Sequence, residues 1–419
     1  MSFLSHATNR IESVLASIRQ LEGAEFPYKD SQDALHTIRE LFERQLNDLM
    51  EQDENSSQEV VKEKCAFSLK NLFCCLPLLG FILRSTNVRN AFEVFGPLRD
   101  IARAVLEPEV LVSKRTTKLL LSSEWGYSPV TYPEISDLPG FVLIGLPAPE
   151  SSNPLLIPLS GHELGHSVWA KRGLAQQFRT DIQKKILEYI KAHWTDYHTL
   201  FPNVSKPVDL DTILFARQTW LRALRWALEQ AEESFCDFIG IKLYGASYLR
   251  AFAYLLSPNV SSPRSASYPD SMARVRNLVK AAKEYKFDPP PDYEDMFRDR
   301  PAQSLRPEDR FRLSAADDAL EKIVDGLISK AGELVSLSGV SKPDTNEIKR
   351  IYERYRLVVP AEKCLTLADI LSAAWEAYED QELWSSVPNM TTDKNRILRD
   401  LVLKNIEIFH GEHILQNAQ

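Results

Sequence analysis

Apolar residues recur at spacings of three and four along most of this 419-residue chain. The pattern is clear in "IESVLASIRQL" near the N-terminus and in "KNRILRDLVLKNIEIF" near the C-terminus. This period places apolar side chains on one face of an α-helix. Because 44% of the residues are hydrophobic, the chain can bury these faces in a sizeable core. The sequence therefore predicts a mainly α protein.

Two stretches interrupt the helical pattern and suggest limits between regions. The first is rich in proline, glycine and serine, begins near residue 123, and contains one strand candidate, "FVLIGLP" at 141–147. That strand would either pair with an extended peptide along its edge or be a simple core strand. The second stretch, residues 287–310, contains five prolines. Its composition is that of a linker or surface arm. The expected organisation is a helical N-terminal region at 1–122, a core at 123–286, the linker or arm at 287–310, and a helical C-terminal region at 311–419.

The net charge and the cysteine content of the chain limit its expected partners and its expected location. The net charge of -8 argues against nucleic acid and anionic lipid as partners, since both need a basic surface. The five cysteines are irregularly spaced and form no CxxC, so we expect no disulfide framework. The N-terminus lacks the apolar stretch of an export signal. These features together predict a cytoplasmic location.

The longest apolar run is "LFCCLPLLGFIL" at residues 72–83. It has twelve residues and includes Pro77 and Gly80. As a helix, this run is too short to cross a bilayer of about 30 Å. We therefore expect a buried core segment and no membrane span.

The segment with the most chemical meaning is "HELGH" at residues 162–166. Residues at i and i+4 share one helix face, so His162 and His166 can bind the same metal ion. Glu163 lies about 100° around the helix, where it can reach a metal-bound water and act as a general base. The motif alone is moderately specific, because an exposed helix face with two histidines has the same pattern.

The neighbours of the motif favour a half-buried helix. Leu164, Val168 and Trp169 make the segment amphipathic. Gly165 lies in mid-helix, where glycine costs about 1 kcal/mol relative to alanine. That cost predicts that another group approaches Gly165 closely.

The start of this helix allows two interpretations. Pro158 fits a first helical turn, and a start there leaves Glu163 free for chemistry. In the competing interpretation, Ser160 is the N-cap and Glu163 is its capping-box partner. We favour the start at Pro158, because it also lengthens the helix that presents both histidines.

A catalytic zinc ion needs a third protein ligand. His193 and His198 are candidates, although "YIKAHWTDYHTLF" also fits an ordinary helix end. The acidic cluster within residues 225–245 is more informative, since Glu233 and Asp237 lie one turn apart beside an apolar stripe. Buried carboxylates are costly unless they are paired or bind metal. The stripe consists of Phe235, Ile239 and Leu243.

We predict that Glu233 binds the metal directly and that Asp237 accepts the other imidazole N–H of a ligand histidine. The small Cys236 would let the two helices pack closely. Glu229, Glu232 and His198 are the next candidates for third ligand. Without the two motif histidines, these acidic residues would be interpreted as solvent-facing charges.

These residues resemble the gluzincin zinc metallopeptidases. In that family HExxH is followed by a glutamate ligand on a second helix, often within Glu-x-x-(Ala or Ser)-Asp. Here Glu233 follows His166 by 67 residues, and Cys236 stands where alanine or serine is usual. The resemblance covers roughly residues 140–280, and the flanking regions match no pattern of the family.

A weaker similarity lies in "SASYPDSMARVRNLV". It resembles the His-Pro-x-x-x-x-Arg-Ile segment of the prenyl-protease-like group and its soluble relatives. Tyr268 stands in place of the histidine, Pro269 matches, and Arg274 with Val275 corresponds to the Arg-Ile pair. The membrane helices of the prenyl proteases are absent from the pattern, so their substrate does not carry over.

The resemblance implies a zincin-like helical core with a short β element and a zinc ion held by His162, His166 and Glu233. Zinc would lower the pKa of its water toward about 7, and Glu163 would transfer the proton to the leaving amine. Tyr268 and Arg274 are candidates for stabilising the oxyanion. The sequence is equally consistent with Tyr268 as an aromatic residue of a turn and with Arg274 as a residue on the surface of a helix.

The expected function is therefore a zinc metallopeptidase that acts on a protein or peptide substrate. The alternative is a non-catalytic or partner-activated helical scaffold with a structural metal site, and a regulatory protein partner would suit the unmatched flanks. Structural zinc sites usually contain cysteine and have no spare general base, so Glu163 favours catalysis.

Overall fold

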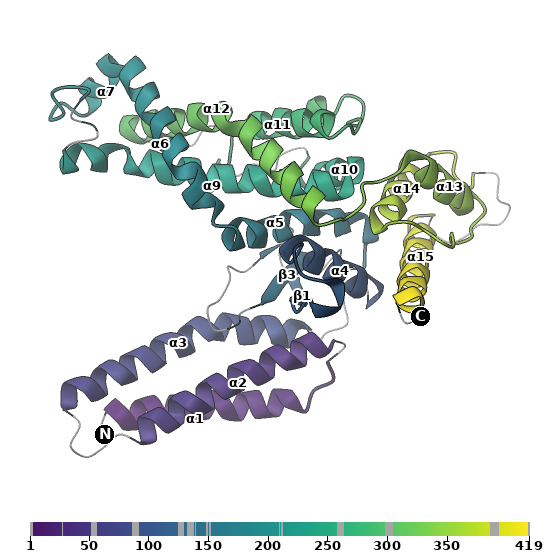
Figure 1. Cartoon of the computed structure of the whole chain (residues 1–419), viewed down its shortest axis with the longest axis horizontal. Coiled ribbons are helices and arrows are strands. Elements are labelled where there is room, and N and C mark those ends of the chain that lie inside the picture. The colour runs from purple at the N-terminus through teal and green to yellow at the C-terminus, as the bar shows by residue number, and fades with distance from the viewer. Residues whose placement is uncertain are drawn as a thin grey trace. The chain divides into compact units, whose positions relative to one another are not determined.

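In the computed structural model the chain is mainly helical, as the periodicity predicts (Figure 1). The structure describes residues 3–417 except 27, 52–56, 86–91, 125–129, 132–137, 139, 148–149, 151, 209, 211–212, 258–263, 298–304 and 386–393. It divides into two compact units, which are residues 1–103 with 114–152, and residues 104–113 with 153–419. This division differs from the expected one, because the strands belong with the N-terminal helices and the C-terminal helices belong with the motif helix.

The first unit is built on three helices that share one apolar core. Its helices are α1 (Phe3–Glu22), α2 (Lys29–Met50), α3 (Gln58–Ser85), the 3₁₀ turn η1 (Phe92–Val94) and most of α4 (Phe95–Leu106). The 3₁₀ turn η2 (Val112–Lys114) falls on the division, and only Lys114 of it belongs to the first unit. Residues such as Ile11, Ile38 and Phe42 are fully buried in this core. Amphipathic faces therefore meet here as the sequence pattern requires.

A small sheet completes the first unit. Its strands are β1 (Lys118–Glu124), β2 (Val130–Thr131) and β3 (Phe141–Pro147), in the order β1-β3-β2. β3 is parallel to β1, with Lys118 opposite Phe141, and antiparallel to β2. The strand expected at 141–147 is confirmed, but it lies between two others, so its edges are already paired at Ile144 and Gly145.

β1 corrects the expectation that helices extend to residue 122. Residues 119–123 are buried in the strand. A strand that is buried on both faces is a continuous apolar run and lacks the alternation that identifies half-buried strands. The backbone N–H of Leu119 donates to the carboxylate of Asp30 in α2 at 3.0 Å, which ties the strand to the helices.

α3 contains the long apolar run. The helix has 28 residues and continues through Pro77, so it is longer than the run itself suggested. Cys75, Leu78 and Phe81 are buried in the core as expected, whereas Phe73 and Leu83 are exposed. Within the described residues α3 is the one helix whose length and composition would allow a membrane span, and a core helix passes the same test. The expected absence of a span therefore stays a prediction.

The second unit carries the histidine motif. A 3₁₀ turn, η4 (Pro154–Leu159), leads directly into α5 (Ser160–Lys171). The remaining elements are α6 (Leu174–Ala192), α7 (Trp194–Leu200), α9 (Leu214–Tyr244), α10 (Ala246–Leu256), α11 (Ser271–Glu284), η5 (Glu294–Met296), α12 (Pro307–Leu337), α13 (Thr345–Arg356), α14 (Leu367–Glu379) and α15 (Lys394–Asn417). The long helices α9 and α12 pack side by side, and α5 crosses α9 (Figure 1).

The proline-rich stretch at 287–310 is partly integrated into this unit. Tyr293 and Phe297 are buried, and the Tyr293 hydroxyl donates to the carbonyl oxygen of Leu249 in α10 at 3.0 Å. Pro307 begins α12, where a proline at the first helical position loses no hydrogen bond. The described part of the stretch is therefore more than a surface arm.

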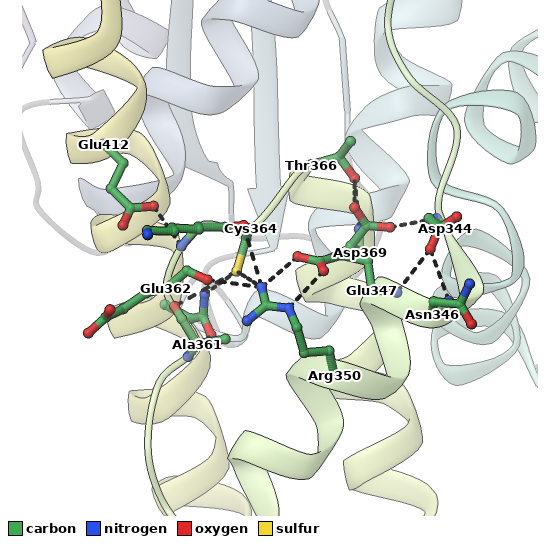
Figure 2. Close-up of polar contacts among 12 residues, drawn as sticks. Asp344, Asn346, Glu347, Arg350, Ala361, Glu362, Cys364, Thr366, Asp369 and Glu412 are labelled. Atoms are coloured by element: carbon green, nitrogen blue, oxygen red, sulfur yellow. Dashed lines mark hydrogen bonds and ion pairs between the residues drawn. The ribbon is translucent and has the colours of Figure 1, made fainter.

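The C-terminal helices are joined by a polar network (Figure 2). Arg350 of α13 donates to the carboxylate of Glu347 and to the carbonyl oxygen of Glu362 in the following loop. Asp369 of α14 accepts the backbone N–H of Asp344, the residue that caps α13. The bond from Arg350 ties the loop after α13 to that helix, and the bond to Asp369 ties the start of α13 to α14.

Candidate metal centre

The two helices of the candidate site touch backbone to backbone. A Cβ atom added to Gly165 of α5 would lie 2.6 Å from the Cα atom of Cys236 in α9. One turn earlier, a Cβ atom on Gly161 would lie 2.9 Å from the Cα atom of Gly240. Only glycine fits at such distances. The close approach expected at Gly165, and the role of the small Cys236, are confirmed.

This crossing brings together His162, His166 and Glu233. One potential ligand atom from each residue lies within 4.8 Å of the other two. The Nε2 atoms of His162 and His166 lie 3.4 and 3.8 Å from the two carboxylate oxygens of Glu233. All three side chains are half-buried. The sequence prediction that these residues meet is therefore confirmed by the geometry.

Each histidine is oriented by a carboxylate on its other ring nitrogen. Nδ1 of His162 lies 2.8 Å from Oδ1 of Asp237, and Nδ1 of His166 lies 2.8 Å from Oε1 of Glu232. When Nδ1–H donates to these carboxylates, the lone pair on each Nε2 is left for a metal. Asp237 occupies its expected place. Glu232 was predicted only as a substitute ligand, and its contact with His166 was missed.

Besides His162 of α5, side chains of α10 and α11 also donate hydrogen bonds to Asp237. It accepts two hydrogen bonds from Arg274 of α11, at 2.7 and 2.8 Å, and one from the Tyr248 hydroxyl of α10 at 2.7 Å. Burial alone would raise the pKa of Asp237, but the charge and hydrogen bonds of Arg274 and the bond with His162 hold it well below its usual range. Asp237 is thus a fixed anion beside His162.

The same anions act on His162. Burial alone would lower the pKa of this imidazole, but the hydrogen bond with Asp237 and the negative charges of Asp237 and Glu233 raise it to about 10. The negative charges that favour a proton on this imidazole would also favour a metal cation, which would compete for the same Nε2 atom.

The donor set and its charges fit a divalent cation. Oε2 of Glu233 is buried and accepts no hydrogen bond from the described residues, although such an atom normally has a partner. Around it lie the carboxylates of Glu163, Glu232 and Asp237, against the single guanidinium of Arg274. When these three carboxylates and Glu233 itself are ionised, they carry four negative charges against the one positive charge of Arg274, a net excess of three. A bound divalent cation would offset most of this excess.

Glu163 occupies the first turn of α5 and is 5% exposed. Burial raises the pKa of its carboxyl above the usual value, although His162 and His166 oppose this shift. A general base works best when its pKa lies near the working pH. The residue that precedes α5 as its N-cap is Leu159, and the Ser160 hydroxyl contacts the Tyr244 hydroxyl at 3.4 Å. The capping-box interpretation, in which Ser160 is the N-cap and occupies Glu163, is therefore wrong. The α-helix begins at Ser160, and the turn that contains Pro158 is 3₁₀.

Tyr268 and Arg274 both reach the centre, in different ways. Tyr268 is 42% exposed, and the charge of Glu233 followed by burial raises the pKa of its hydroxyl. The guanidinium of Arg274 lies over the Tyr268 ring at 5.6 Å and 3.7 Å from Oε2 of Glu233. Because the Arg274 side chain is only 13% exposed and is bonded to Asp237, it is oriented toward the carboxylates.

The other histidine candidates lie elsewhere. His193 and His198 contact the backbone carbonyls of Tyr189 and Val204, and neither belongs to the ligand group formed by the described residues. The expected buried stripe is confirmed, since Phe235, Ile239 and Leu243 are at most 2% exposed. Tyr248 was missed, because a tyrosine in an apolar helix carries no local sign of a polar role.

No family model matches this chain, and comparisons with curated proteins and with solved structures find no significant match.

Proposed function

We propose that this chain is a zinc-dependent metallopeptidase that hydrolyses peptide bonds in a protein or peptide substrate. One observation carries the proposal. His162, His166 and Glu233 converge with their potential ligand atoms within 4.8 Å of one another, and the buried carboxyl of Glu163 lies on the same helix as the two histidines. Two histidines and one glutamate form the ligand set of catalytic zinc sites that keep one position open.

His162 and His166 would bind zinc through Nε2, and Glu233 through its carboxylate. A zinc ion at this point supplies Lewis-acid chemistry, which lowers the pKa of water and polarises a substrate carbonyl. Asp237 and Glu232 hold the two imidazoles in the tautomer that binds metal. The protein thus supplies a rigid site before any substrate arrives.

Glu163 is the general base of the proposed reaction. Its carboxylate accepts a proton from the attacking water and passes that proton to the nitrogen of the leaving amine. The Tyr268 hydroxyl is the proposed donor to the oxygen that becomes negative at the carbonyl. Arg274 acts through Asp237 and Glu233, whose charges it partly neutralises.

The test compares the wild-type protein with Glu163→Gln, and uses Glu188→Gln as the control. Glu188 pairs with Lys185 on the exposed surface of α6, so this control repeats the chemical change away from the centre. Each protein is analysed for zinc and incubated with a mixed peptide library. We expect stoichiometric zinc in all three and cleavage by the wild type and Glu188→Gln. Glu163→Gln should be slower by about 10²–10⁴-fold, the usual contribution of general acid–base catalysis.

Two results would contradict the proposal. Cleavage by Glu163→Gln at the wild-type rate would exclude Glu163 as the base. A zinc-loaded wild type that cleaves no peptide in the library would favour the structural-metal scaffold. Because Glu163→Gln should retain bound substrate, covalent capture with this variant would also identify the substrate.

A further inference from the structure

Helix α14 packs against the other C-terminal helices and against elements that adjoin the metal centre. Ten of its thirteen residues are buried, which shows that it has neighbours on nearly every face. It lies beside α13 and α15 (Figure 1). It also packs against α10, η4 and α9. Three of these neighbours carry or adjoin residues of the centre. The C-terminal region therefore contacts elements that carry the metal ligands or lie next to them.

The first contact is between Trp375 of α14 and the turn that precedes the motif helix. The Trp375 indole N–H donates to the carbonyl oxygen of Leu155 at 3.1 Å, and both residues are 3% exposed. In a 3₁₀ turn the carbonyl of residue i accepts from the N–H of residue i+3. Here that residue is Pro158, which has no N–H. Trp375 supplies the missing donor, and so fixes the turn from which α5 starts.

The second contact passes through α10. Arg250 of α10 pairs with Glu379 of α14 at 3.0 Å, and the Tyr254 ring packs edge-on against Trp375 with centroids 6.0 Å apart. On the same helix, Tyr248 is 1% exposed and points to Asp237. α14 thus fixes the position of the helix that presents Tyr248.

Tyr248 and His162 share one acceptor atom. The Tyr248 hydroxyl lies 2.7 Å from Oδ1 of Asp237, and Nδ1 of His162 lies 2.8 Å from the same oxygen. The Tyr248 ring lies against Gly240, where an added Cβ atom would come within 2.3 Å of a ring carbon. The ring therefore has little freedom to move, and its hydroxyl helps to hold the oxygen that orients His162, together with Arg274, which donates to the same oxygen at 2.8 Å.

We propose that Tyr248 and Trp375 are positioning residues for the metal ligands, and that the C-terminal helical region thereby sets the metal affinity of the centre. Tyr248 acts on His162 through Asp237. Trp375 acts on the start of α5 through Leu155. The proposal rests on the proposed metal centre and is independent of whether the loaded protein cleaves peptides.

The experiment measures zinc affinity in Tyr248→Phe and Trp375→Phe, each of which keeps an aromatic ring and loses one donor. Tyr285→Phe and Trp384→Phe are the matched controls. Their donors bond to backbone carbonyls of Ile328 and Tyr355 in the same unit, and both side chains are buried. Dissociation constants come from competition with a chromogenic chelator, and the absorption spectrum of the Co²⁺-substituted proteins reports ligand geometry. Unfolding of the metal-free proteins checks that each variant is folded.

We expect Tyr248→Phe to raise the zinc dissociation constant about 10–100-fold, as for other residues that orient a metal ligand. Trp375→Phe should raise it about 3–10-fold, the effect of one hydrogen bond. Both should alter the Co²⁺ spectrum, whereas the two controls should match the wild type. If one of the two test variants does not fold, the zinc affinity of the other variant still tests the proposal.

The proposal is overturned if the folded test variants bind zinc within twofold of the wild type and give its Co²⁺ spectrum. It is also overturned if the controls weaken binding equally, because the effect would then be general destabilisation. A wild type that binds no zinc overturns both this proposal and the proposed function. A wild type that binds zinc but cleaves nothing, with weaker binding in the two variants, overturns the proposed function alone.

Discussion

The guanidinium of Arg274 and the carboxylate of Asp237 form a buried pair joined by two hydrogen bonds. The two residues come from different helices and lie 37 positions apart. Removing one partner of such a pair leaves an unpaired buried charge, which is strongly destabilising. The pair also gives the centre a defined response to acid.

Asp237 should make the protein less stable in acid. Its folded pKa is held below that of the unfolded chain, so its stabilising contribution is complete above about pH 4, where the unfolded carboxyl is ionised. The contribution is lost as the pH falls further toward the folded pKa. Urea unfolding between pH 3 and 7 should therefore show a smaller acid loss in Asp237→Asn than in the wild type. The exposed Asp325 provides the control Asp325→Asn, and equal acid loss in all three proteins would contradict the prediction.

Removing a ligand should remove the metal. We expect His162→Ala, His166→Ala and Glu233→Ala each to lose zinc, whereas Glu163→Gln keeps it, because only the first three side chains form the ligand group. Metal analysis of the purified variants decides the matter. Stoichiometric zinc in Glu233→Ala would refute the third ligand, and Glu232, which already lies beside His166, would replace it.

Gly165→Ala should separate the helices that carry the ligands. The added methyl would meet the backbone of Cys236 at 2.6 Å, so α5 and α9 must move apart even though alanine favours the helix itself by about 1 kcal/mol. We expect a loss of stability of about 1–3 kcal/mol, as for other overpacked cores, together with weaker zinc binding. Gly411→Ala on α15, where nothing lies within 4 Å, is the control. A variant at Gly165 as stable as that control would show that the crossing is looser than described.

Tyr268→Phe tests the proposed oxyanion donor. If the hydroxyl bonds the oxyanion, kcat should fall by about 10²–10³-fold. KM should change little, because the bond forms mainly in the transition state. The phenylalanine keeps the ring under Arg274, so a change in folding should not confuse the result. A wild-type kcat would make Tyr268 an ordinary turn residue.

The features of the site that depend on spacing within a single helix could be predicted from the sequence. Spacing within one helix predicts that His162 and His166 share a face, and a mid-helix Gly165 predicts a close neighbour. The first expectation is confirmed by the convergence of both histidines on Glu233, and the second by the crossing at Cys236. The stripe beside Glu233 likewise places the carboxylate on the partner helix, because burial follows the helical period.

What the sequence could not predict depends on contacts between distant segments. Trp375 bonds to a carbonyl 220 positions away, and no local pattern distinguishes it from any other core tryptophan. β1 was assigned to a helix because its short apolar run fits either structure until its partner strand is known. The division into two compact units likewise depends on which elements pack together, so it could not be read from local pattern.

The backbone contact between α5 and α9 also bears on the order in which the protein folds. His166 and Glu233 are separated by 67 residues, so the complete ligand set exists only after a long loop has closed and the two helices have docked. A metal ion bound as proposed would therefore bind late in folding and slow the unfolding of the second unit, since an ion that binds only the native state stabilises the contacts that form with it. In a cell, the supply of metal would then influence how long each molecule survives as well as what it can do.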